Sequence, residues 1–221
     1  YYSDRTLASP LRPRDALSAP GVSRPAVDNY FWDIAFSLAG PILEDALWYF
    51  TNARMIFQSK TTPLIPWEDP LGNSHLAFNQ RSSEKTEFLK LSSQFVPQLK
   101  VIASVCAAQR YQSAYEPTLS WNLPQQATLI LDNEKSLMAT GSLSYQIDPN
   151  TYLDLKGGYS QQKIPLKLND KGQSKPQYSD QGTGFVWGSS RFNEILERKR
   201  FQAQAAITRF QDRLMAADHE L

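Results

Sequence analysis

Cysteine and histidine are scarce in this 221-residue chain, which has Cys106, His75 and His219 and no others. A single cysteine excludes an internal disulfide, and no Cys/His spacing fits a zinc site. Cys106 lies in the apolar run Val101–Ala108, so we expect it to be a small buried hydrophobe. No GxSxG segment accompanies His75, which we expect to be an ordinary loop histidine. The sequence therefore predicts no metal site and no catalytic residue, and hence a protein that is not an enzyme.

Phosphate-binding glycine motifs are also missing. The run from Gly182 to Gly188 has the wrong spacing for GxGxxG, and no P-loop occurs. Gly157 and Gly158 fall inside an expected strand, where a bulge or close packing is the usual reason for glycine. No cofactor is predicted, and cofactor-binding residues stay unknown.

Charge of either sign is not in excess, because 23 basic residues face 22 acidic ones and the net charge is +1. Such a balance gives no field that would attract DNA or RNA, so we predict no nucleic-acid partner. A long uncharged apolar run is absent too. The best window, Tyr30–Phe50, contains Asp33, Glu44 and Asp45, and we expect it to be buried in protein or to lie at an interface rather than to span a membrane.

Aromatic residues are concentrated in Val27–Phe57. On a helical projection, the polar residues of this stretch form one stripe roughly 80° wide, and the rest of the circumference is apolar. We therefore predict two helices, Val27–Ala39 and Pro41–Ile56, separated at Gly40-Pro41, or one helix kinked at that point. A helix this apolar needs a cover from its own chain, from partner subunits or from a lipid surface.

Two more helices are predicted from apolar spacings of three and four residues. One covers Glu84–Ala114, begins at Ser83 and is kinked by Pro97. The other covers Arg191–Ala217 near the end of the chain.

Alternating apolar and polar residues predict strands in the second half. The alternation occurs in Leu119–Leu123, Leu143–Ile147 and Leu153–Tyr159, and the last two flank Asp148-Pro149-Asn150 as a hairpin would. Further strands are expected at Ile164–Leu168 and Thr183–Trp187.

The predicted fold class is α+β, with N-terminal helices, an antiparallel β-sheet or hairpins in the second half, and a C-terminal helix. We divide the chain into an extended Pro/Arg arm (1–26), a helical part (27–114), a β part (115–188) and a C-terminal helix (189–221). Residues 27–221 are expected to form one compact domain.

Three kinds of function remain open. The first is a non-catalytic assembly subunit of a larger, membrane-associated complex, which acts through contacts with other protein subunits and which a membrane surface could also contact. The interface residues expected for it are Trp32, Phe36, Trp48, Phe50, Arg12 and Arg14. The second is a component of an outer-membrane or envelope oligomeric channel or secretion apparatus, because the hairpin around Asp148 has outer-membrane-type alternation. The third is a lipid- or small-ligand-binding module.

The outer-membrane channel alternative is supported by a pattern in roughly the last hundred residues. The layout of a helix, polar-alternating strands and then Trp187–Arg191 leading into a long Ala/Gln/Arg-rich helix resembles the TolC-like outer-membrane channel family. The proline-broken first half departs from that family and the last predicted helix is too short for it, so no membership is assigned. We expect a membrane-associated location in an envelope or organelle. The sequence starts at Tyr1 rather than at Met, so either a targeting segment has been removed or the true N-terminus is absent from it.

Overall fold

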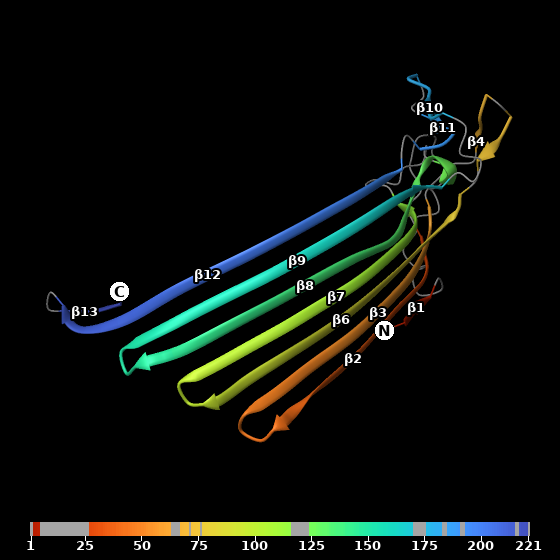
Figure 1. Ribbon diagram of the computed structural model, residues 1–221. Coiled ribbons are helices and arrows are strands. Elements are labelled where there is room, and N and C mark those ends of the chain that lie inside the picture. The colour runs from red at the N-terminus through yellow and green to blue at the C-terminus, as the bar shows by residue number, and fades with distance from the viewer. Residues whose placement is uncertain are drawn as a thin grey trace.

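A computed structural model describes residues 2–4, 27–62, 67–70, 72–75, 77–115, 124–169, 176–182, 185–190, 193–214 and 217–220. Within these ranges the protein is built almost entirely from one antiparallel sheet (Figure 1). Its strand order is β1-β2-β3-β6-β7-β8-β9-β12-β13, so the strands of the sheet follow one another as in a meander. No helix among the described residues is long and apolar enough to cross a membrane.

Seven strands of the sheet are 15–21 residues long, about three times the usual strand length. They are β2 (Val27–Leu43), β3 (Leu47–Thr61), β6 (Asn79–Val96), β7 (Leu99–Tyr115), β8 (Leu129–Asp148), β9 (Thr151–Leu168) and β12 (Glu194–Leu214). Short strands β1 (Tyr2–Asp4) and β13 (Ala217–Glu220) pair with the outer strands β2 and β12. Outside the sheet, β4 (Trp67–Glu68) pairs with β5 (Ser74–His75), β10 (Tyr178–Ser179) pairs with β11 (Val186–Trp187), and η2 (Gln125–Ala127) is a single 3-10 turn.

The two ends of the sheet differ in their connections. At one end, called the turn end, residues 44–46, 97–98 and 149–150 join β2 to β3, β6 to β7 and β8 to β9. At the other end, called the loop end, much longer segments join β3 to β6, β7 to β8 and β9 to β12 (Figure 1).

Successive hairpins are staggered. Leu47 begins β3 and pairs with Ser93, but β6 continues to Val96 before it turns. Leu99 likewise pairs with Tyr145, and β8 continues to Asp148. Each hairpin turn is therefore shifted along the strands by roughly three residues, or ~10 Å, relative to the turn of the hairpin before it. Neighbouring turns are two strand spacings, or about 9.6 Å, apart. The strands are thus tilted by about 45° from the perpendicular to a line drawn through the turns.

All four predicted helices are wrong, and with them the α+β fold class. Val27–Ala39 and Pro41–Ile56 belong to β2 and β3, and Gly40-Pro41 lies inside β2. Glu84–Ala114 forms β6 and β7, with Pro97 in the turn between them. The final predicted helix coincides largely with β12.

The helical period in β6 and β7 came from adding together two faces of a sheet. Phe88, Ile102 and Cys106 lie on one face, and Leu89, Leu91 and Val105 lie on the other, as the register shows. Since both faces carry apolar residues, spacings of three and four arise without a helix.

The predicted antiparallel sheet is confirmed and is larger than expected. β8 and β9 form the hairpin around Asp148-Pro149-Asn150, and Ile164–Leu168 continues β9. Val186–Trp187 pairs with β10 rather than with the large sheet. The expected strand Leu119–Leu123 lies outside the described residues.

The buried core is small for a chain of this length. In the described part, Ala114, Ala127, Leu129, Leu131 and Leu166 are the buried apolar residues. The cluster of Leu129, Leu131 and Leu166 lies at the loop end, packed against Tyr115, Ile164 and Leu168. Most of the large sheet therefore has no apolar layer packed on it.

Candidate membrane-contact surface

The register separates the side chains of the sheet into two faces, because directly paired residues point to the same side. One face carries the even-numbered residues Tyr30–Gly40 of β2 and the odd-numbered residues of β3, β6, β7, β9 and β12. It also carries the odd-numbered residues Lys135–Ile147 of β8. We call this side the apolar face and the opposite side the polar face.

An apolar band crosses the apolar face in the half of the sheet nearer the turns. Its segments are Trp32–Leu38, Tyr49–Phe57, Leu89–Phe95, Val101–Ala107, Leu137–Tyr145, Leu153–Tyr159 and Phe201–Ile207. Large side chains of this face are strongly exposed, with Phe36 at 62%, Phe201 at 75% and Ile207 at 66%. Five of the segments have seven residues and two have nine, so at a tilt of about 45° they are roughly 16–21 Å tall, somewhat less than the ~25 Å apolar band of an outer-membrane barrel.

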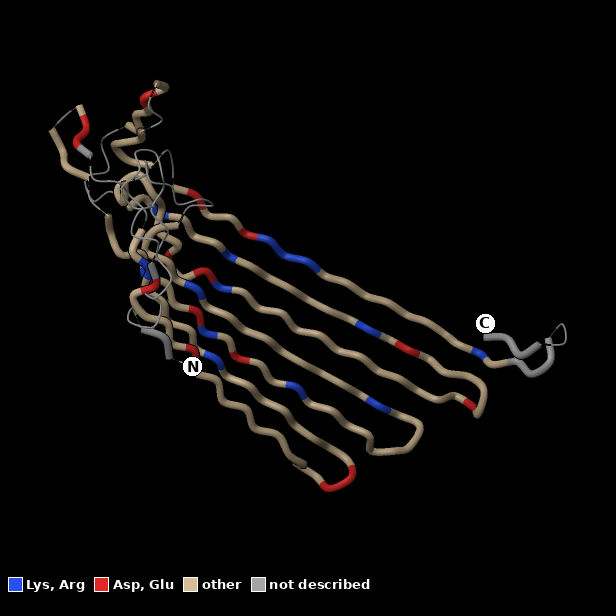
Figure 2. Tube along the Cα trace, turned by 180° about the vertical axis from the view of Figure 1, so that it is seen from behind, with Lys and Arg blue, Asp and Glu red and all other residues tan. Residues whose placement is uncertain are grey.

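Charged residues are also divided between the two faces of the sheet. Within the seven segments, all charged residues lie on the polar face, and they are Asp33, Arg54, Lys90, Asp154 and Lys156. On the apolar face, charge is found at the loop-side border of the band, at Lys85, Glu87, Lys135, Lys163, Glu197 and Lys199. Glu87 lies directly between Ala53 and Ala107 of the band, and Lys85 lies opposite Met55. Figure 2 shows the same contrast between charge near the loop end and sparse charge along the middle of the strands.

Aromatic side chains mark the limits of the band on the apolar face. Tyr49 and Tyr145 end their segments on the turn side, whereas Phe57, Tyr159 and Phe201 end theirs on the loop side. Aromatic side chains are enriched at the two interfaces of a bilayer, where one part of the ring contacts hydrocarbon and the other part contacts water.

The polar face is held by ion pairs and side-chain hydrogen bonds between strands. Arg54 Nε donates to Asp33 Oδ1 at 2.8 Å, from β3 to β2. Arg110 Nε donates to Glu134 Oε2 at 2.8 Å, and Gln162 Nε2 donates to Glu134 Oε1 at 2.7 Å. These contacts satisfy the buried Glu134 carboxylate across three strands.

A second polar cluster ties the loops together at the loop end. Asp69 and His75 are both buried, with Asp69 Oδ2 3.1 Å from His75 Nε2. Gln126 Nε2 lies 3.0 Å from His75 Nδ1 and links the β4–β5 hairpin to η2. His75 thus contributes to loop structure, and among the described residues no three His, Cys, Asp or Glu side chains gather to hold a metal ion.

Acidic groups outside the band are stabilised in their ionised form. A hydrogen bond from Lys199, 2.9 Å away, lowers the pKa of Glu197, and Gln161 adds a second one. At the turn end, the Asn150 amide donates to Asp148 Oδ1 at 2.8 Å and lowers the pKa of Asp148.

The predicted interface residues do not lie on one surface. Trp32 and Phe36 are exposed on the apolar face of β2. Trp48 and Phe50 lie on the polar face of β3, where Phe50 packs against Phe88 with ring centroids 5.9 Å apart. Arg12 and Arg14 lie outside the described residues.

Ile34, Leu38, Phe201 and Ile207 of the band were not among the predicted contact residues, although a period of two was present in the sequence. Trp32, Ile34, Phe36 and Leu38 alternate with Asp33, Ala35, Ser37 and Ala39. Phe201, Ala203, Ala205 and Ile207 alternate in the same way with Gln202, Gln204, Ala206 and Thr208.

Large apolar side chains are exposed together on one face of the described sheet. An exposed apolar surface of this kind marks a site of contact with protein, ligand or lipid.

No protein-family model matches this chain, and no curated protein or solved structure matches it either. The functional argument therefore rests on the geometry of the sheet.

Proposed function

We propose that this sheet spans an outer-membrane-type bilayer as part of the wall of a β-barrel, with the apolar face toward lipid and the polar face toward the interior. The observation that carries the proposal is the division of charge, because every charged residue of the band segments is on the polar face. Long tilted strands, short turns at one end and long loops at the other support the same assignment. The location is then an envelope membrane, and the role is that of a channel or transport component.

The assembly-subunit function predicted from the sequence remains a second proposal. It is supported by the edge of β12, which β13 pairs only between Phe210 and Leu214. In the described residues, Glu194–Arg209 pairs with β9 on one side and with no strand on the other. An edge this long is a template for a further strand, so protein partners or further strands would complete the sheet.

Adjacent substitutions on β8 test the membrane proposal. Leu143 lies in the band on the apolar face, and its neighbour Ser142 lies on the polar face. Leu143→Arg should destabilise the chain in phosphatidylcholine vesicles by about 1–2 kcal/mol, because arginine would enter the hydrocarbon between its midplane and the interface marked by Tyr145. Ser142→Arg, the matched control, should cost less than about 1 kcal/mol, since its side chain stays in a polar interior.

The measurement is urea unfolding of each full-length variant from the vesicles, followed by tryptophan fluorescence. Equal losses for the two variants would contradict a lipid-facing apolar side. Wild-type protein that stays outside the vesicles and is digested by added protease would contradict membrane insertion itself.

A further inference from the structure

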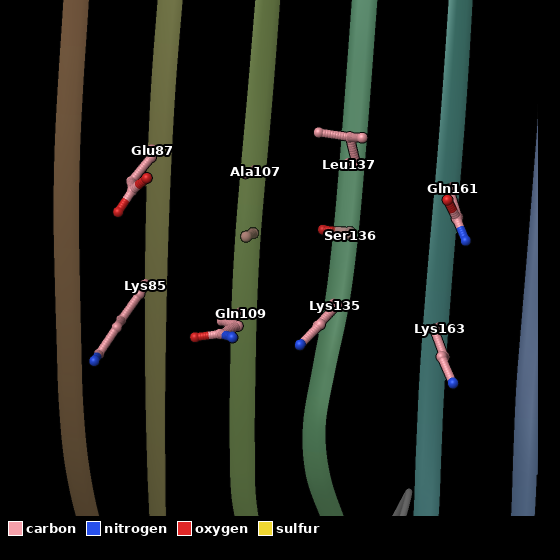
Figure 3. A pocket seen from close by; sticks show the side chains of 10 residues that line it. Lys85, Glu87, Ala107, Gln109, Lys135, Ser136, Leu137, Gln161 and Lys163 are labelled. Carbon is pink, nitrogen blue, oxygen red and sulfur yellow. The ribbon is translucent and has the colours of Figure 1, made fainter.

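A row of lysines borders the apolar band on its loop side. Lys85, Gln109, Lys135 and Lys163 are direct cross-strand neighbours on β6, β7, β8 and β9. Figure 3 shows them in one row over these four strands. They line a shallow hollow of about 510 Å³ that also includes Leu137 of the band. The row therefore meets the apolar surface directly.

The lysines of this row are only partly balanced by carboxylates of the protein. In the described part of the chain, Lys85, Lys135 and Lys163 form no ion pair within 4 Å, whereas Lys167 and Lys199 each do. Glu197 lies directly opposite Lys163, and Glu87 lines the same hollow, so three lysines face two carboxylates there. Lys135 and Lys163 are directly opposite each other, an arrangement of like charges that destabilises a sheet. On the polar face, by contrast, Arg54 and Arg110 each bind a carboxylate.

The charges and the apolar surface around the lysine row indicate the chemistry of a partner that could bind there. An anion at the lysine row would relieve the repulsion, and Gln109 offers an amide donor beside it. The band next to the row would contact an apolar chain. A molecule that joins an anionic headgroup to acyl chains meets both requirements.

We propose that the row of Lys85, Lys135 and Lys163 binds the phosphate headgroup of an anionic membrane lipid whose acyl chains lie on the apolar band. This inference rests on the proposed function, because only a sheet in a bilayer presents the row at headgroup depth. It adds that the loop-side leaflet supplies a lipid that the protein selects by charge.

The test compares two brominated lipids as quenchers of a dye on the band. The dye is attached to Ala107→Cys, on the apolar face, in a Cys106→Ser background. Full-length protein is placed in phosphatidylcholine vesicles that contain brominated phosphatidylglycerol or, separately, the same amount of brominated phosphatidylcholine. The ratio of the two quenching curves gives the preference for the anionic lipid.

We expect the unsubstituted row to prefer phosphatidylglycerol. The preference should fall by about fivefold for each lysine changed to glutamine, the effect of one basic residue at a membrane surface. The triple variant Lys85→Gln, Lys135→Gln and Lys163→Gln should retain no preference. The matched control removes three charges from the polar face, as Lys90→Gln, Lys100→Gln and Lys156→Gln, and should keep the preference.

Each other outcome is informative. Equal quenching by both lipids overturns the lipid site and leaves the membrane function intact, whereas no quenching by either lipid overturns both. Loss of preference in inorganic phosphate, but not in chloride of equal ionic strength, overturns the lipid assignment in favour of a soluble phosphate. If the triple variant is no longer quenched by brominated phosphatidylcholine, it does not insert into the vesicles, and the three single variants are used in its place. An unchanged preference for phosphatidylglycerol in all three single variants overturns the inference.

Discussion

At the scale of single residues, buried charge on the polar face is paired and hydrogen-bonded. Glu134 is 7% exposed, and its two oxygens accept hydrogen bonds from Arg110 and Gln162. It follows Asn133, whose positive φ of 57° lies where the register between β7 and β8 shifts. The bulge places the carboxylate between two strands that both supply a donor.

Removal of the Arg110 guanidinium should lower the free energy of unfolding. Arg110→Met leaves a buried carboxylate with one donor, and we expect a loss of about 1–3 kcal/mol, below the value for a fully buried pair because Arg110 is itself partly exposed. Urea unfolding of the full chain in vesicles measures the loss. Arg54→Met is the control and should cost less, since Asp33 is more exposed than Glu134. A larger loss for Arg54→Met would argue against burial as the cause.

At the scale of elements, the hairpins are closed by local side-chain contacts as well as by the ladder. In the turn between β8 and β9, Asp148 accepts a hydrogen bond from the Asn150 amide, the usual arrangement of an Asx turn. The same contact lowers the pKa of the Asp148 carboxyl from its ordinary 3.8.

The turn should therefore loosen in acid. A carboxyl group whose pKa is lower in the folded state stabilises that state fully above its unfolded pKa of 3.8, and this contribution disappears as pH falls through the lower folded value. Hydrogen exchange of the Asn150 amide, compared at each pH with Asp148→Asn, measures the effect. The ratio of the two rates should change below pH 3.8 and stay constant above it. A ratio that changes only near neutral pH would contradict this assignment.

At the scale of the whole molecule, the turns and the loops lie at opposite ends of one sheet, as Figure 1 shows. If the band spans a bilayer, the two ends lie in different aqueous compartments. Glu44 and Asn150 belong to turns, whereas Gln181 belongs to the β10–β11 connection at the loop end.

Single cysteines should report this sidedness. In a Cys106→Ser background, Glu44→Cys and Asn150→Cys should react with a membrane-impermeant maleimide from the same side of sealed vesicles. Gln181→Cys should react from the other side. The labelled fraction before and after detergent gives the side for each position. Labelling of all three from one side only, in vesicles with protein of uniform orientation, would contradict a spanning sheet.

Much of the β8–β9 hairpin was predictable from the sequence, because Leu143, Tyr145, Leu153 and Leu155 alternate cleanly around a turn of Asp, Pro and Asn. The same alternation in β2 and β12 was overlooked in favour of a helical period. In β3 and β7 the sequence was ambiguous, since Phe50 and Ile102 add apolar residues to the polar face. Periodicity cannot separate two apolar faces from one helical stripe in such segments.

The candidate surface could not be derived from any single strand. Lys85, Lys135 and Lys163 are distant in sequence, and only the register of β6–β9 places them in one row beside the band. The sequence by itself determined the turn at Asp148-Pro149-Asn150, the scarcity of metal-binding and nucleophilic residues, and the concentration of aromatic residues in Val27–Phe57. The tertiary structure decided which residues share a face, because a strand has two faces and only pairing with its neighbours assigns every side chain to one of them.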